Sequence, residues 1–498
     1  MKKFFYLLLL ISSISACNEE KKSFYNPEMV TINGVIENFS KEDSIEDVKV
    51  YSYDFLTNDW AEEHQAIVDE NGHFSLQFLS AYDQVLFFRF KQSSNLFVSP
   101  NSTLDLTFDA KAATKKEFLN SLRFTNELAK ENELLKKYLL NDPLDYNELN
   151  TMMSSKTSPE EIQVYLSELY DQKKAPYIDN FIKENNPPKS IKNWLKIEKE
   201  LKPIIDYLQY AVFHFRATSK ETPYKDNFPK AFTDRIDNLP ILTDKSFVNN
   251  DVYTTLPNYY NAYLGQYVQS KYQVPWVKAD SIIYSKEIFS FKNNPAFIRI
   301  LYFDRLNNSL KNNDLSFYNT HQKTIDSLFK NTVYEKAIQE KYTSTKNLIE
   351  SPQLPENTEL LEFSSDDATT FLDEIIKNAN GKVIYIDNWA TWCSPCKEQF
   401  KNATPQLKEK FSEDVEFVYL CHLSDKNLYL PTISQYKVQG KHYFITDEQN
   451  KVLTKLLNIT GYPTYNLINK KGEIVHSGFQ FRPSETITTK LLTALIKE

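Results

Sequence analysis

The residues whose types and spacing predict chemistry are Cys393 and Cys396, two cysteines separated by two residues. They follow the apolar run 383–387, which we expect to be a buried strand, and we expect a helix to begin at the pair. A cysteine at the N-terminus of a helix faces free backbone N–H groups and the positive end of the helix dipole, and both favour the thiolate. The thiolate is the attacking form of cysteine, and the second cysteine lies one turn further on. The spacing therefore predicts dithiol–disulfide exchange.

Three other uses of a Cys-x-x-Cys pair were weighed against redox chemistry. Structural zinc needs four ligands, but Cys421 and His422 are adjacent rather than spaced, so we expect no metal site. A haem attachment site needs a histidine directly after the second cysteine, where this chain has Lys397. A purely structural disulfide stays open as the alternative, although a strand-to-helix turn is the usual context of a redox pair.

The segment 389–396, with sequence WATWCSPC, resembles the active-site segment of the thioredoxin superfamily, and most closely its exported TlpA/ResA branch. Two further motifs support the resemblance. Gly461-Tyr462-Pro463-Thr464 is similar to the cis-proline loop of that family, and Asp387, six residues before Cys393, matches its buried acid. The resemblance covers residues 356–498 and implies a thioredoxin-like α/β fold with a Cys393–Cys396 redox disulfide. The segment 356–498 also resembles the C-terminal domain of larger Bacteroidota lipoproteins.

The resemblance implies a role for each matched residue. Pro463 in the cis form would remove a backbone donor beside the disulfide and leave Tyr462 free to pair with an extended substrate; Thr464 completes that binding loop. Trp392 is expected to pack beside the thiols and limit solvent access. Asp387 is expected to relay a proton for Cys396, with its pKa raised by burial; an aspartate satisfied by local N–H groups is the alternative.

Two further side chains of this region are expected to be passive. Lys397 is interpreted as a solvated helix lysine, and its positive charge near the pair as the less favoured alternative. Cys421 ends a strand whose alternate residues are apolar, so we expect a buried free cysteine that behaves as a small hydrophobe. The nearest proline after the second cysteine, Pro405, lies one helical turn later than the family often places it, so we expect a displaced kink.

The first residues are typical of a processing signal rather than of a fold. Lys2 and Lys3 precede an apolar run, residues 4–11, that is much shorter than the roughly 20 residues of a membrane span. The segment Ile14-Ser15-Ala16-Cys17 resembles a bacterial lipobox, which predicts cleavage after residue 16 and lipidation of Cys17. Residues 17–27 would then be a tether to the membrane. A plain signal peptide with a chance cysteine is the alternative.

The upstream sequence predicts two further folded regions. Residues 28–110 contain period-two apolar patterns separated by turn signals, which favour a small β-sandwich. Residues 115–350 change to helical periodicity, with a helix start at Ser158-Pro159-Glu160-Glu161 and one apolar helical face through Phe124, Leu128, Leu135 and Leu139. The fold class is therefore multidomain α+β, with the α/β domain of residues 356–498 after a proline-containing linker.

Composition limits the partners. The net charge of −8 over 498 residues argues against nucleic acid as a ligand, since phosphate binding requires a basic surface. We expect an envelope lipoprotein, facing the periplasm or the cell surface, that reduces disulfides in exported proteins without a cofactor. The family implies a membrane protein as its electron donor. The alternative is a ligand- or protein-binding lipoprotein in which the redox domain is accessory.

Overall fold

The computed structural model describes residues 25–498, except for residues 41–42, 44–46, 58–61, 155, 219–227 and 365–369. The predicted signal segment and Cys17 lie outside the described residues. The chain divides into two compact units, one that reaches to Asp304 and one that comprises Arg305–Glu498. No described helix combines the length with the apolar composition that a bilayer span demands.

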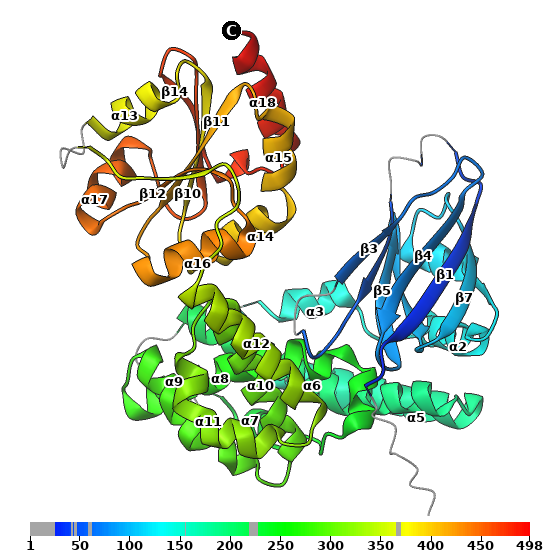
Figure 1. Cartoon of the computed structure of the whole chain (residues 1–498). Coiled ribbons are helices and arrows are strands. Elements are labelled where there is room, and N and C mark those ends of the chain that lie inside the picture. Colours follow the sequence, from blue (N-terminus) through cyan, green and yellow to red (C-terminus); the bar gives the residue numbers. More distant parts are fainter. Residues whose placement is uncertain are drawn as a thin grey trace, which may run out of the picture. The chain divides into compact units, whose positions relative to one another are not determined.

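The strand-rich N-terminal region, drawn mainly in blue in Figure 1, contains two four-stranded sheets that share one apolar core. One sheet has the order β4 (His73–Ser80), β1 (Glu28–Glu37), β7 (Ser102–Asp109) and β8 (Arg123–Thr125). The other has the order β3 (Glu62–Ala66), β2 (Val48–Ser52), β5 (Gln84–Phe90) and β6 (Gln92–Val98). Alternate residues of β4 and β7 are buried, as the period of a half-buried strand requires. The predicted β-sandwich is confirmed.

The apolar periodicity did not predict three strands of this region, β3, β6 and β8. β3 is almost entirely polar, and the first half of β6 is polar as well, so neither shows the apolar alternation of a strand. The predicted helical face through Phe124 and Leu128 was wrong at its start. Phe124 lies in β8, opposite Leu106 of β7, and Leu128 only precedes the next helix. Pairing with a neighbouring strand outweighs a local pattern of helical period.

The middle of the chain is helical, as expected. In order come α1 (Lys115–Ser121), α2 (Ala129–Leu140), α3 (Tyr146–Met152), α4 (Pro159–Ser167), a π-helix (Glu168–Lys174), α5 (Ala175–Asn185), α6 (Lys189–Thr218), α7 (Lys230–Asp237), α8 (Thr255–Tyr272), α9 (Trp276–Ser285) and α10 (Pro295–Lys311), with short 3₁₀ turns at Asp244–Val248, Asn250–Val252 and Glu287–Phe291. The predicted helix start is confirmed, because Ser158 and Glu161 form a reciprocal capping box.

The second unit begins with the end of α10 and two further helices, α11 (Ser316–Phe329) and α12 (Val333–Glu350). The helical periodicity expected over residues 115–350 includes the run 325–349. That run is divided between α11 and α12, because the chain turns at Asn331, whose φ of 59° is left-handed. Helix α12 packs against α16 (Lys426–Tyr436) of the α/β region. These helices are therefore part of the same compact unit as the dithiol.

The C-terminal region contains a six-stranded sheet, with the order β14 (Ile474–Gly478), β13 (Thr464–Ile468), β10 (Val383–Trp389), β11 (Val415–Cys421), β12 (Gly440–Phe444) and β9 (Thr358–Leu361). The central strand β10 is parallel to β11 and antiparallel to β13. All seven residues of β10 are buried. The strand that ends four residues before Cys393 is thus held from both sides.

Helices cover both faces of this sheet (Figure 1). α14 (Ser394–Asn402), α15 (Thr404–Phe411), α16 and α18 (Thr486–Lys497) pack on the face that carries the dithiol, and α13 (Phe371–Asn378) and α17 (Asp447–Leu456) pack on the other. This is the predicted thioredoxin-like α/β layer fold. The displaced kink at Pro405 proves to be a break, because α14 ends at Asn402 and Pro405 lies in the first turn of α15.

Candidate active site

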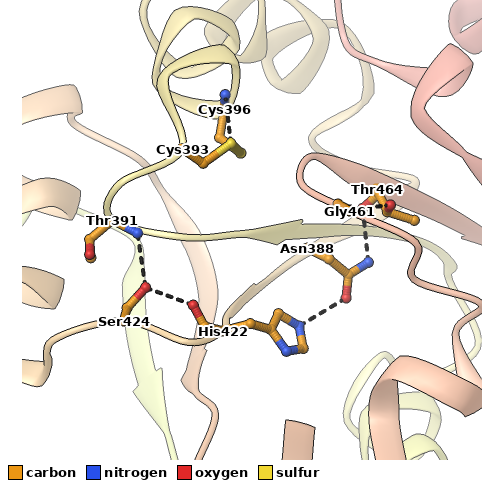
Figure 2. The surroundings of a disulfide bond; sticks show 8 residues. All are labelled: Asn388, Thr391, Cys393, Cys396, His422, Ser424, Gly461 and Thr464. Carbon is orange, nitrogen blue, oxygen red and sulfur yellow. Dashed lines mark hydrogen bonds between the residues drawn. A yellow bond between two sulfur atoms is a disulfide. The ribbon is translucent and has the colours of Figure 1, made fainter. Parts of the chain in front are cut away.

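The dithiol lies where β10 passes into α14 (Figure 2). Cys393 and Cys396 are joined by a disulfide, and their Cα atoms are 5.3 Å apart. Cys393 is the N-cap residue of α14, and its sulfur accepts the backbone N–H of Cys396 at 3.2 Å. Only 3% of Cys393 and none of Cys396 is exposed. The same N–H and the helix dipole would stabilise a Cys393 thiolate after reduction.

Asp387 lies in the core layer that contains the disulfide. It shares a face of β10 with Tyr385 and Trp389, which pack in one cluster with Cys393 and Cys396. Asp387 is fully buried, and neither of its carboxylate oxygens has a hydrogen-bond partner among the described residues. Burial therefore raises the pKa of this carboxyl well above its usual range. The alternative of an aspartate satisfied by local N–H groups is wrong.

The loop before β13 contains a cis peptide bond between Tyr462 and Pro463, as the resemblance implied. The Thr464 hydroxyl donates to the carbonyl of Gly461 at 2.7 Å, which closes the loop. The side-chain N–H of Asn388 donates to the carbonyl of Thr464 at 2.9 Å (Figure 2). Asn388, which the sequence reasoning missed, thus ties the cis-proline loop to the strand that leads to the dithiol. Its polar side chain next to Asp387, at the end of an apolar run, was the available signal.

His422 extends this connection. Its Nε2 lies 3.2 Å from Oδ1 of Asn388, and its Nδ1 lies 3.0 Å from the side chain of Asn450 on α17. The hydroxyl of Tyr462 donates to Asn450 at 3.2 Å, and the Tyr462 ring stacks on the imidazole. The ring of His422 is fully buried, and burial lowers its pKa to about 4. His422 is therefore a neutral hydrogen-bonding group at ordinary pH, and the sequence reasoning had considered it only as a metal ligand.

The loop after β11, which contains His422, also forms hydrogen bonds with the segment that precedes Cys393 (Figure 2). The N–H of His422 donates to the carbonyl of Trp389 at 2.8 Å. The Ser424 hydroxyl donates to the carbonyl of His422 at 2.7 Å and accepts the N–H of Thr391 at 2.9 Å. The loop after β11 therefore links the segment before the dithiol to the cis-proline loop, two segments about 70 residues apart in the chain.

Trp392, which was expected to pack beside the thiols and limit solvent access, is 59% exposed. Its indole N–H donates to the carbonyl of Leu423 at 2.8 Å, and its ring meets that of Tyr462 edge-on with centroids 5.8 Å apart. Leu423 is also exposed and has a φ of 44°, which is rare for a leucine. Trp392, Leu423 and Tyr462 form an apolar rim beside the disulfide. By contrast, Trp389 is fully buried in the core.

The two side chains expected to be passive differ in outcome. Cys421 is a free, fully buried cysteine as predicted, and burial raises the pKa of its thiol to about 12. It therefore stays a thiol at ordinary pH. The interpretation of Lys397 as a solvated lysine was wrong, because only 6% of it is exposed. Its ammonium donates to Oδ1 of Asn312 at 2.7 Å, and burial lowers its pKa to about 8. Its hydrogen-bond acceptor, Asn312, lies upstream of the α/β region, where sequence patterns could not place it.

A buried central strand, a Cys-x-x-Cys disulfide at a helix N-terminus and a cis-proline loop together define a thioredoxin-like domain. The family model for redoxin matches residues 353–493, so this C-terminal segment is a redoxin domain of the thioredoxin superfamily. Within the second unit, the match leaves out the end of α10 together with α11 and α12.

The redoxin domain is similar to known thiol–disulfide proteins. The thiol-disulfide oxidoreductase ResA of Bacillus subtilis is 29% identical over 100 residues, which cover 20% of this chain and 54% of ResA. The chain thus spans about half the length of that relative. Thioredoxin-1 of Drosophila melanogaster is 28% identical over 100 residues, 20% of this chain and 86% of that protein. A solved thiol-disulfide oxidoreductase from Bacteroides vulgatus is 31% identical and covers 23% of this chain and 79% of its own, with a TM-score of 0.21.

Proposed function

We propose that this protein is a thiol–disulfide oxidoreductase of the cell envelope that reduces disulfides in exported proteins. The observation that carries the proposal is the disulfide at the N-cap of α14, beside a cis-proline loop and an exposed apolar rim. The similarity of the domain to ResA supports the reaction type. The lipobox-like segment that ends at Cys17 supports an envelope location with a lipid anchor.

The reaction would proceed by two exchanges. The Cys393 thiolate attacks one sulfur of a substrate disulfide, forms a mixed disulfide and releases the other substrate sulfur as a thiolate. Cys396 loses its proton and attacks the sulfur of Cys393, which releases the second substrate thiolate and forms the Cys393–Cys396 disulfide. Two electrons pass from the protein dithiol to the substrate. A dithiol protein of the membrane would return them by the reverse exchange.

Surrounding residues would serve distinct steps. Asp387 is the buried base that would accept the Cys396 proton, because its raised pKa lets it hold that proton and its carboxylate has no competing described partner. The backbone of Tyr462 would pair with an extended substrate segment, while Trp392 and Leu423 would contact apolar substrate side chains. The network through Asn388 and His422 would keep that loop at a fixed distance from Cys393.

Reduction of insulin by the full chain tests this function. With an external dithiol as electron source, we expect turnover by the native protein and a fall to about 1% or less for Cys393→Ser, since the attacking thiolate is gone. Cys421→Ser is the matched control, because that thiol is buried and does not ionise. Equal activity of native protein and Cys393→Ser would refute the proposal.

A second candidate function is ligand binding by the first unit. A cleft of about 640 Å³ lies between helices there and is lined by residues that include Tyr170, Tyr207, Ala231 and Arg235. That volume is within the range of small-molecule sites. Native mass spectrometry of the full chain would show a bound small molecule, and Ala231→Trp, which fills the cleft, would displace it. If native protein carries no ligand, ligand binding by the first unit is rejected and the redox function is the one that stands.

A further inference from the structure

Lys397 is a buried ammonium group in the first turns of the active-site helix. It lies four residues after Cys393, and its backbone N–H donates to the carbonyl of Cys393 at 3.2 Å. Residues four apart lie on the same face of a helix, and helical side chains lean toward the N-terminus. Cys393 is the N-cap residue and Lys397 the fourth residue of α14, so the lysine is one helical turn from the residue whose sulfur would carry a negative charge after reduction.

The acceptor of this ammonium comes from outside the redoxin match. Oδ1 of Asn312 accepts from Lys397 at 2.7 Å, while the side-chain N–H of Asn312 donates to the carbonyl of Asn308 at 2.7 Å. The second bond fixes which end of the amide faces the lysine. The neighbouring Asn313 donates to Gln435 of α16 at 2.9 Å. Residues 308–313, at the end of α10, are thus attached to the redoxin domain at two points.

Lys397 lacks a negative partner in the disulfide form. Among the described residues, no carboxylate forms an ion pair with it, and burial alone lowers its pKa to about 8. Asp387, the buried acid of β10, forms no described hydrogen bond or ion pair with Lys397 and so is not its partner. His422 is neutral because burial lowers its pKa. The other charged groups of α14 near it, Glu398 and Lys401, are exposed and screened by water.

A buried charge without a partner is costly, and reduction of the disulfide would create its missing partner. When the two cysteines accept two electrons and two protons, Cys393 can release its proton and become a thiolate one helical turn from Lys397. We propose that Lys397, held in position by Asn312, stabilises this thiolate and raises the reduction potential of the dithiol. The segment before the redoxin domain thereby sets the electron affinity of the site. This inference rests on the proposed function and names what regulates it.

The equilibrium with glutathione tests the inference on the full chain. The reaction converts the protein disulfide and two glutathione molecules into the protein dithiol and oxidised glutathione. For Lys397→Met, which keeps length and removes charge, we expect the equilibrium constant for reduction to fall about fivefold, or ~20 mV. The pKa of Cys393, measured from the pH dependence of iodoacetamide labelling, should rise by about 0.7. Lys397→Arg should stay within about twofold of native protein because it keeps the charge.

Two further variants separate charge from packing. Lys401→Met removes an exposed lysine one turn further along α14 and should leave both quantities unchanged. Asn312→Ala should move both in the same direction as Lys397→Met, by a smaller factor, because the ammonium loses its fixed position. If Lys397→Met lowers thermal stability and changes neither the equilibrium constant nor the pKa of Cys393, the lysine only fastens the segment, and the inference is overturned.

The proposed function can fail independently of this inference. The glutathione equilibrium and the pKa of Cys393 are properties of the dithiol and need no protein substrate. A native chain that exchanges with glutathione but does not reduce insulin would refute the reductase function. The dependence on Lys397 would still be decided by its own variants.

Discussion

Buried charged side chains have partners of opposite charge in the helical region of the first unit but not around the dithiol of the second. In the helical region of the first unit, Lys174 is almost fully buried but lies 2.6 Å from Asp142 and 3.7 Å from Glu198. Lys202 is paired with Asp206 in the same way. Around the dithiol of the second unit, Asp387 has no described hydrogen-bond partner and Lys397 has only a neutral amide. Paired charges are compatible with a purely structural role, whereas unpaired ones cost stability and persist where a reaction uses them.

This comparison predicts the largest effect on stability for the paired charges. Lys174→Met leaves Asp142 and Glu198 buried without their cation, so we expect the free energy of unfolding to fall by about 3–5 kcal/mol. Lys173→Met is the matched control, because its pair with Glu168 is exposed and is worth at most about 1 kcal/mol. Urea unfolding of both variants measures the difference. Equal effects would show that the buried pair is not special.

A smaller effect of opposite sign is expected at Asp387. Its pKa is higher in the folded protein than in the unfolded chain, so the folded state binds more protons above about pH 4. The contribution of Asp387 to stability should therefore decrease as pH rises toward the folded pKa, by up to about 1.4 kcal/mol per pH unit. Asp387→Asn should remove this slope and stabilise the oxidised protein at pH 7.

Urea unfolding of the oxidised protein at pH 5, 6 and 7 gives that slope. Asp387→Asn should also slow release of the substrate from the mixed disulfide, because the proton acceptor for Cys396 is lost. Because buried His422 contributes a slope of opposite sign to both proteins, Asp387 is judged by their difference: equal pH dependence of native protein and Asp387→Asn would mean that Asp387 is not strained by burial. A stabilised variant with an unchanged rate would assign Asp387 no part in the proton transfer.

The smallest effect is expected at His422, which is buried but satisfied. His422→Phe fills the space but breaks the bonds to Asn388 and Asn450. We expect kcat/KM for insulin to fall about tenfold through displacement of the cis-proline loop, with exchange by glutathione within about twofold of native protein. His476→Phe, in β14, is the control. A parallel loss of insulin reduction and of exchange with glutathione would indicate general damage to the domain.

The predictable features of the fold were those recorded in local patterns. The Ser158–Glu161 capping box and β11 appear at the predicted residues, because caps and apolar runs depend on neighbours in sequence. β3, β6 and β8 were missed because their pairing partners, rather than their own residues, make them strands. An edge strand needs few apolar residues, so its sequence shows no clear period.

The residues of the site also differ in whether a local motif could predict them. Cys393, Cys396 and the cis bond before Pro463 could be predicted because each belongs to a short contiguous motif. The burial of Lys397 could not, because Asn312 reaches it from 85 residues away. Asn388 and His422 are single polar residues whose partners come from other elements. Contacts that depend on tertiary packing have no fixed spacing in the sequence, so no motif predicts them.

The central claim is that Cys393 attacks and Cys396 resolves. Incubation of the reduced Cys396→Ala chain with a disulfide-containing protein, followed by mass spectrometry of the isolated complex, tests it most directly. We expect a stable mixed disulfide that joins Cys393 to the substrate and disappears on addition of a dithiol. A complex linked through Cys421, or no complex while native protein still reduces the same substrate, would contradict it.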